Sequence, residues 1–275
     1  MAWPKLPDWS VYATGVLVLA IFADSGQERA DAPAAPPAVK EAVTAVASGS
    51  SLRPSAMTPL PPPDRQPTSG TAFSVSDTGV WLTARHVVAG CRRAAVMVSE
   101  GRGVAAKVWG DRTSDVAVLT TDGGAPPLPL VAGPALVVGQ RAYHPGFPQG
   151  TAGETTSRFL GRYVLRAAAR GSQPQPVLAW AEVGRTDGLK GSLAGLSGAP
   201  VLDEAGRVVG VTLAESPRRG RIYTAPPEAI RAALARSGRT PAGYAQGLGI
   251  TTENYGRAAD ALRRDLRVAQ VVCLG

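Results

Sequence analysis

The sequence contains very few residues of the types that build metal and redox centres. Among its 275 residues there are two cysteines, Cys91 and Cys273, and two histidines, His86 and His144. The cysteines do not form a CxxC pair, so a zinc site would have to recruit carboxylates from unrelated segments. We therefore expect no metal ion and no cofactor.

Aromatic residues are also scarce, at 5% of the chain, although the formal net charge is +8. The basic residues are nearly all arginines, scattered singly among alanine, glycine and valine. No basic stripe is interleaved with aromatic residues, as binding to single-stranded nucleic acid requires. We interpret the arginines as a solvated surface and expect no nucleic-acid partner. The alternative is a basic adaptor for anionic surfaces, whose binding would depend strongly on salt.

Long hydrophobic runs are absent except near the N-terminus, from Trp9 to Ala23. As a helix this run would measure about 22 Å, which is short against a hydrocarbon core of about 30 Å. It is long enough for a signal-peptide core, but a small-x-small cleavage site is missing at its end. Residues 1–23 are thus predicted to be an N-terminal membrane anchor or signal segment, with the anchor favoured. Either interpretation exports the rest of the chain.

The next segment, residues 24–67, is rich in alanine, proline and serine and has no helical or alternating periodicity. It lacks the apolar surface needed to offset its ordering entropy, so we expect a disordered linker.

From Gly70 onward, short apolar runs alternate with turns rich in glycine, proline and aspartate. The runs are Thr71–Val75, Val80–Thr83, Ala94–Val98, Val104–Trp109, Val116–Thr120, Gln140–Tyr143, Phe159–Leu165, Val177–Ala181, Pro200–Leu202, Val208–Leu213 and Ile222–Thr224. They predict an all-β domain over residues 68–238, built as two six-stranded antiparallel β-barrels. Helices are expected only late, over Pro227–Arg236 and Glu253–Leu266. Residues 239–275 are predicted to be an extension that packs on this domain and ends in a strand, Val268–Cys273.

One glycine-flanked serine, Ser197 in Gly195-Leu196-Ser197-Gly198-Ala199-Pro200, has the surroundings of a nucleophile. Glycine on both sides permits a tight turn that exposes the hydroxyl and points backbone N–H groups at a developing oxyanion. Taken alone, the segment could equally be a glycine-rich hairpin.

Two further segments supply the partners that a serine nucleophile needs. His86 directly follows a predicted strand, and Asp115 precedes the apolar strand Val116-Ala117-Val118-Leu119. A carboxylate in that position can hold an imidazole in one tautomer and stabilise its protonated form. Taken singly, each residue could be an ordinary structural one.

The order His86, Asp115, Ser197 resembles that of the trypsin-like (chymotrypsin-fold) serine peptidases, and within them the bacterial HtrA-type group. Further segments that match are Gly70-Thr71-Ala72-Phe73, Gly146-Phe147-Pro148 and Ile222-Tyr223-Thr224-Ala225-Pro226. An α/β-hydrolase would need a histidine after the serine. A subtilisin-like order through His144 would need crossover helices, so we interpret His144 as structural.

The resemblance implies a serine endopeptidase that acts on protein or peptide substrates through the triad His86, Asp115 and Ser197. It places the oxyanion hole at the N–H groups of Gly195 and Ser197. The implied substrate-binding residues are Ala194, Val211, Thr212, Leu213 and Thr224. No aspartate stands at the expected pocket base, so a small or medium apolar side chain is predicted there. The implied location is the periplasm, with a tether to the inner membrane, or else secretion.

The sequence departs from the family at two positions beside the serine. Leu196 replaces an acidic or amide residue, so activation by pairing with a newly cut N-terminal amine is excluded. Ala199 replaces a glycine. Only about forty residues follow Arg236, so we expect no PDZ domain. The alternative function is a catalytically incompetent binding module on the same fold, which recruits a partner.

Many trypsin-like enzymes tie the loop beside the catalytic histidine to a neighbouring segment, and Cys91 lies in that loop. Export implies an oxidising compartment, and two cysteines allow one intramolecular pair. We therefore predict a disulfide between Cys91 and Cys273; two unpaired buried cysteines are the alternative.

Overall fold

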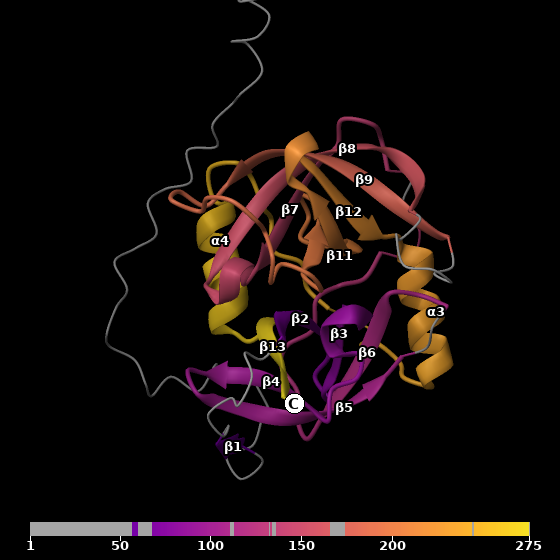
Figure 1. The fold of residues 1–275 in the computed structure, drawn as a ribbon, viewed down its shortest axis with the longest axis vertical. Coiled ribbons are helices and arrows are strands. Elements are labelled where there is room, and N and C mark those ends of the chain that lie inside the picture. The colour runs from indigo at the N-terminus through magenta and orange to yellow at the C-terminus, as the bar shows by residue number, and fades with distance from the viewer. Residues whose placement is uncertain are drawn as a thin grey trace, which may run out of the picture.

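Two β-barrels, one above the other in Figure 1, form most of the part of the chain that the structure describes. The computed structural model describes residues 57–59, 68–110, 113–131, 133, 136–165, 174–243 and 245–274. The predicted N-terminal anchor or signal segment lies outside these residues, as does most of the predicted linker. In the part of the chain that the structure describes, no helix is long and apolar enough to cross a membrane.

The first barrel, at the bottom of Figure 1, closes with a strand from the end of the chain. Its strands are β2 (Thr68–Ser76), β3 (Val80–Ala84), β4 (Arg93–Ser99), β5 (Arg102–Trp109), β6 (Val116–Thr121) and β13 (Val268–Leu274). The antiparallel order is β5-β4-β13-β2-β3-β6, and β6 pairs back onto β5. Val271 lies opposite Gly70 on one side and Val96 on the other. The sequence predicts that the last strand packs on the domain, but not that it is a full member of the barrel.

A short additional strand, β1 (Met57–Pro59), pairs antiparallel with the start of β5. These three residues lie inside the predicted disordered linker, which therefore has an ordered pairing at this point. The main chain can form a ladder with an exposed strand edge whatever its side chains are, so composition alone did not reveal it.

The second barrel is continuous in sequence. It consists of β7 (Arg141–Gly146), β8 (Gly153–Leu165), β9 (Gln175–Arg185), β10 (Pro200–Leu202), β11 (Val208–Ser216) and β12 (Arg221–Ala225). The order is β10-β11-β12-β9-β8-β7, and the pair Leu202 and Tyr143 closes the ring. The predicted all-β class with two six-stranded antiparallel barrels is confirmed.

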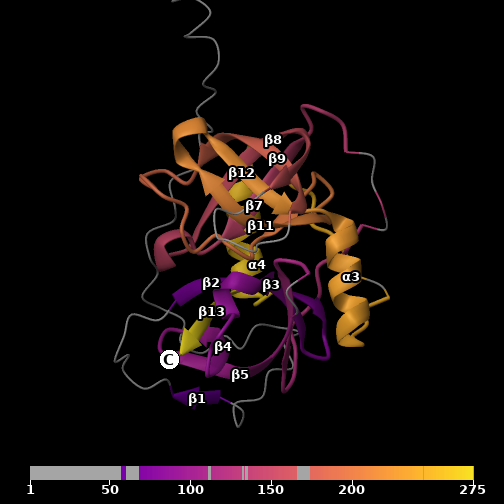
Figure 2. The same cartoon turned by 45° about the vertical axis from the view of Figure 1, so that its right-hand side comes forward.

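Two helices flank the barrels, on opposite sides in Figure 1. Helix α3 (Pro227–Ser237) begins with proline and ends at Gly238, whose φ of 65° is left-handed. Helix α4 (Tyr255–Arg264) contacts β7 and β8 of the second barrel and β13 of the first. When the view is turned, α3 stands clear at the edge while α4 moves behind the barrels (Figure 2). The C-terminal extension thus touches both barrels.

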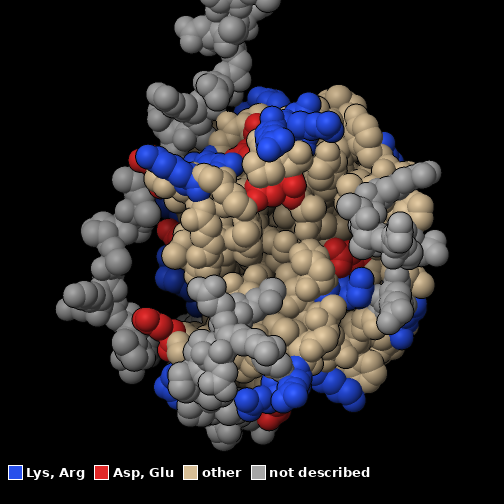
Figure 3. Space-filling model, viewed as in Figure 1, with Lys and Arg blue, Asp and Glu red and all other residues tan. Residues whose placement is uncertain are grey.

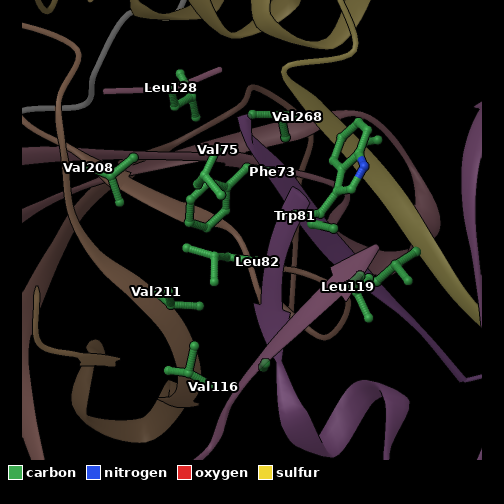
Figure 4. Close-up of a cluster of buried hydrophobic side chains, with 14 of the residues drawn as sticks. Phe73, Val75, Trp81, Leu82, Val116, Leu119, Leu128, Val208, Val211 and Val268 are labelled. Carbon is green, nitrogen blue, oxygen red and sulfur yellow. The ribbon is translucent and has the colours of Figure 1, made fainter. Parts of the chain in front are cut away.

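One apolar core runs from the first barrel into the second (Figure 4). Phe73, Trp81 and Leu119 fill the first barrel and are fully buried, as are Val211 of β11 and Val268 of β13. Because both barrels bury side chains in the same cluster, the junction between them is closely packed, and residues on its rim are held at fixed positions.

On the face seen in Figure 3, lysine and arginine lie in separate groups. Groups lie over the second barrel and along the lower edge of the first, and another lies at mid-height on the right beside acidic residues. On this face the described basic residues form no continuous stripe, which fits their interpretation as solvated surface.

Candidate active site

His86 lies on a single helical turn, α2 (Arg85–Val88), that follows β3 directly. Val87 and Val88 are buried and anchor the turn, while the His86 side chain is exposed. Its Nδ1 lies 2.7 Å from Oδ2 of Asp115. The His86 backbone N–H also donates to Oδ1 of the same carboxylate, at 2.9 Å. Asp115 therefore fixes both the ring and the backbone of His86.

Asp115 is itself held from two sides. Its carbonyl oxygen accepts a hydrogen bond from the Arg85 N–H at 2.9 Å, which links the start of β6 to α2. Its N–H donates to Oε1 of Gln175, which begins β9 in the second barrel, at 3.1 Å. The carboxylate therefore sits where the two barrels meet.

Ser197 lies in the turn that leads into β10, pressed against the first barrel. Its carbonyl oxygen accepts the Thr71 N–H at 2.8 Å. A side chain on Gly198 would lie 2.0 Å from the Thr71 carbonyl oxygen and 2.9 Å from the Ala84 nitrogen. Only glycine permits this approach, and Gly198 has a φ of 90°. Because Ala84 is two residues before His86, the turn brings Ser197 beside the His86–Asp115 pair.

The Ser197 hydroxyl points to a backbone acceptor in this structure. It donates to the Leu213 carbonyl oxygen at 3.3 Å and makes no hydrogen bond with His86. The histidine–aspartate half of the expected triad is therefore connected, and the serine–histidine link is not.

Two backbone N–H groups of the serine loop, those of Gly195 and Ser197, have no acceptor among the described residues. The neighbouring N–H groups have acceptors. The Leu196 N–H donates to the Leu193 carbonyl oxygen, and the Gly198 N–H donates to the Thr212 carbonyl oxygen. A pair of unoccupied donors that flank a serine is the arrangement that binds a developing oxyanion.

A small cavity of about 40 Å³ opens beside the serine. It is lined by Leu193, Ala194, Leu196, Ser197, Thr212, Ala214, Glu215 and Ile222. Of the predicted substrate-binding residues, Ala194 and Thr212 line it.

Val211, Leu213 and Thr224, the other residues predicted to bind substrate, do not line this cavity. Side chains alternate along a strand, so Thr212 and Ala214 face the cavity while Val211 and Leu213 are buried on the other side. Thr224 is buried and accepts a hydrogen bond from Nε1 of Trp180 at 2.9 Å. Leu213 contributes through its carbonyl group rather than its side chain.

His144 lies inside the second barrel, fully buried. Its Nε2 lies 2.7 Å from the Ser157 hydroxyl and its Nδ1 3.1 Å from that of Thr212. Burial lowers the pKa of His144 to about 3, so the ring is neutral at physiological pH. This environment supports the structural interpretation of His144.

Cys91 and Cys273 are joined by a disulfide, with Cα atoms 5.3 Å apart. Cys91 follows α2, and Cys273 is the second-last residue of β13. The bond ties the C-terminal strand to the segment that carries His86.

Comparisons with known proteins agree with this architecture. The family model of the trypsin-like peptidase domain matches residues 70–211, which include His86, Asp115 and Ser197. The chain is 31% identical over 195 residues to HhoA of Synechocystis sp., a serine protease by its description, covering 68% of this chain and 48% of HhoA. It is 32% identical over 154 residues to Protease Do-like 1, chloroplastic, of Arabidopsis thaliana, covering 53% of this chain and 33% of that protein.

Solved structures give the same fold. The active form of the Rv3671c protease of M. tuberculosis matches with a TM-score of 0.51 and 23% identity, covering 67% of this chain and 77% of that one. The HtrA-type protease AlgW with a decapeptide matches with a TM-score of 0.50 and 22% identity, covering 62% and 51%. The chain spans about half the length of HhoA and about a third of the Arabidopsis protein. From the family model and the double-barrel fold, we conclude that the chain belongs to the trypsin-like peptidase family, with similarity to its HtrA-type members.

Proposed function

We propose that the protein is a serine endopeptidase that cleaves peptide bonds through His86, Asp115 and Ser197. The observation that carries the proposal is the double hydrogen bond from His86 to Asp115, next to a serine whose loop offers two unoccupied N–H groups. The His86 side chain is exposed, so it does not contribute to core packing, yet two hydrogen bonds hold it in place. It is suited to accept and return a proton.

In the proposed reaction, the Ser197 hydroxyl first turns from the Leu213 carbonyl to Nε2 of His86. As Oγ bonds to the substrate carbonyl carbon, its proton passes to Nε2. The N–H groups of Gly195 and Ser197 then bind the oxyanion. Asp115 keeps the proton on Nδ1 and stabilises the imidazolium without being protonated itself.

Collapse of this intermediate breaks the C–N bond, and His86 gives its proton to the leaving amine. The acyl group remains on Ser197 as an ester. Water then attacks the ester carbonyl while His86 takes the water proton, and the proton returns to Ser197 as the carboxylic acid leaves. The sequence of steps needs no metal or cofactor.

The cavity supports a preference for a small apolar residue before the cleaved bond. Its volume is about 40 Å³, and the buried side chains of Leu196 and Ile222 form part of its wall. A long or bulky side chain would have to displace this wall, so we propose protein or peptide substrates with alanine or valine at that position.

The hydrogen bond from Ser197 to Leu213 favours a second candidate, a peptidase-fold module that binds a partner without cleaving it. In such a module the hydroxyl would keep its backbone acceptor permanently. The two candidates differ in whether Ser197 becomes nucleophilic.

Labelling with a fluorophosphonate probe separates these candidates. The full chain should be labelled at Ser197, and Ser197→Ala should lose both labelling and cleavage of casein or peptide libraries while it keeps the wild-type melting temperature. Absence of labelling in a folded wild-type protein would reject the peptidase and support the binding module.

The location of the protein is proposed to be outside the cytosol, in a periplasmic or equivalent compartment. The disulfide between Cys91 and Cys273 supports an oxidising environment. The apolar run Trp9 to Ala23 supports tethering to the inner membrane, with secretion as the alternative.

A further inference from the structure

The turn between β7 and β8 carries one residue, Gln149, with an unusual backbone. Its φ of 54° and ψ of 24° lie in the left-handed region, which disfavours residues other than glycine, asparagine and aspartate. The side chain is exposed, so it does not contribute to core packing. A residue held in such a conformation at the surface points to a local requirement for its contacts.

All three hydrogen-bond donors of Gln149 are directed at the loop that precedes Ser197. The backbone N–H donates to the Ala194 carbonyl oxygen at 2.5 Å. The side-chain Nε2 donates to the carbonyl oxygens of Lys190 at 2.6 Å and Ser192 at 2.8 Å. One amide group has two N–H bonds, so both are occupied.

These contacts determine how the peptide unit between Ala194 and Gly195 is oriented. In a trans peptide the C=O and N–H bonds point in opposite directions. Because the Ala194 carbonyl is drawn to Gln149, the Gly195 N–H points away from Gln149. That N–H is one of the two unoccupied donors of the proposed oxyanion hole.

The loop and the turn also touch at the backbone. A side chain on Gly195 would lie 2.5 Å from the Phe147 carbonyl oxygen and 3.2 Å from the Gln149 nitrogen. On the opposite side, Glu215 holds the same loop, since its carboxylate accepts hydrogen bonds from the Ser192 hydroxyl and the Leu193 N–H.

Arg263 of α4, in the C-terminal extension, supports the turn between β7 and β8. Its Nη1 donates to the carbonyl oxygens of Gly153, at 3.1 Å, and Gly146, at 3.4 Å, which are the two ends of the turn. Its Nη2 pairs with Glu154 at 2.9 Å, and both side chains are buried. The guanidinium thus fixes the base from which Gln149 projects.

We propose that Gln149 is a positioning residue that keeps the Gly195 N–H aimed at the oxyanion, and that Arg263 of the C-terminal extension holds the turn that carries it. The inference rests on the proposed peptidase function. Leu196 makes such a device necessary, because this apolar, buried side chain cannot anchor the loop through an ion pair. The chain's last helix is thereby connected to the reaction centre through Arg263, Gln149 and the loop ahead of Gly195.

The central test replaces Gln149 in the full chain with glycine. Gln149→Gly removes the side-chain amide but relieves the left-handed backbone, so the melting temperature should stay the same or rise. The value of kcat should fall about 10- to 100-fold because the oxyanion donor is misplaced. KM should change less than about twofold, because ground-state binding does not use this donor. Gln149→Glu, which faces carbonyl oxygens with a carboxylate, should show the same loss.

The matched control is Gln140→Ala, a glutamine directly before β7 whose side chain accepts a hydrogen bond from the Val137 N–H. It should keep wild-type kcat and labelling rate. A Gln149→Gly variant with wild-type kcat would overturn the inference, as would a loss confined to KM.

The contribution of Arg263 is tested by a double-mutant cycle. Arg263→Lys keeps the charge opposite Glu154 but loses the forked contact with the turn, so kcat should fall in the wild-type background. In the Gln149→Gly background it should fall no further if both residues act through one element; independent, multiplying losses would overturn that coupling.

A folded wild type that never labels at Ser197 would reject the function and the inference together. A wild type that labels, with Gln149→Gly labelling equally fast, would reject the inference alone.

Discussion

The two barrels differ in how the chain builds them. All six strands of the second barrel follow one another in sequence, from β7 to β12. The first barrel takes five strands from β2 to β6 and its sixth, β13, from the end of the chain, placed between β2 and β4. The barrel that carries His86 and Asp115 therefore cannot close until the C-terminal residues arrive. This difference makes the proposed general base dependent on a segment distant in sequence.

The interiors differ as well. Both barrels bury hydrogen-bonded hydroxyl groups, such as those of Ser74 and Thr83 in the first. The second barrel also buries a titratable side chain, His144, between Ser157 and Thr212. The first barrel thus depends on closure by a distant strand, and the second on a buried imidazole that must stay neutral. Solution conditions and truncations should affect the two differently.

Removing β13 should destabilise the first barrel more than any other change considered for the two barrels. A chain that ends at Leu266 loses Val268, Val271 and Val272, all buried, and leaves β2 and β4 with unpaired edges. Burial of each valine stabilises by about 1.5–3 kcal/mol, so the loss is comparable to the total stability of a typical domain, about 5–15 kcal/mol. Amide hydrogen exchange should show loss of protection in β2 and β4, with β8 and β9 still protected. Uniform loss in both barrels would show that the second barrel does not stay folded without β13.

Loss of the disulfide should cost less than loss of the strand. Cys91 and Cys273 close a loop of 182 residues, and replacing both with serine should lower the free energy of unfolding by about 2–5 kcal/mol. Guanidinium denaturation with and without reductant measures this. Reductant should destabilise the wild type and leave the double variant unaffected; a wild type insensitive to reductant would show that β13 is held without the bond.

Much of the fold could be predicted because strand patterns are local. Every predicted strand is present, and β13 spans the predicted run Val268–Cys273. Helix α4 begins at Tyr255, two residues later than predicted, after a turn in which the Thr251 N–H donates to Asn254. The partners of β13 could not be predicted, since apolar alternation shows that a strand exists without showing which edge it joins.

For the site, the order of His86, Asp115 and Ser197 in recognisable segments located the chemistry, and their catalytic roles stay predictions. Gln149 and Arg263 gave no signal in the sequence. A glutamine in a Pro-Gln-Gly turn resembles any surface turn, and an arginine in an amphipathic helix resembles a solvated one. Their importance depends on backbone carbonyl groups brought close only by the tertiary fold.

Acid should weaken the second barrel through His144. Its folded pKa is about 3, below the unfolded value of 6.5, so the unfolded chain binds the extra proton first as pH falls. The contribution of neutral His144 to the free energy of unfolding is therefore fully present above pH 6.5, and it is lost progressively as the pH falls towards 3. Between pH 7 and 4.5 the loss should be on the order of 3 kcal/mol. Urea denaturation at both pH values measures it. His144→Gln, which keeps a hydrogen-bonding side chain without a titrating group, should remove most of this pH dependence, whereas an unchanged slope would assign it to other residues.

The smallest effect is expected at the exposed ion pair that joins the second barrel to α3. Arg162 of β8 pairs with Glu228 of α3, and both side chains are about half exposed. Water screens such a pair and ordering two long side chains opposes it, so Arg162→Ala should cost less than about 1 kcal/mol.

The buried pair of Arg263 and Glu154 joins the same barrel to α4, with side chains 9% and 6% exposed. Arg263→Ala leaves the Glu154 carboxylate buried without its partner and should cost about 3–5 kcal/mol. Thermal denaturation of the two variants compares the attachments directly. Equal losses of stability in the two variants would contradict this prediction. They would mean that the exposed pair stabilises the attachment of α3 as much as the buried pair stabilises that of α4, whatever their burial.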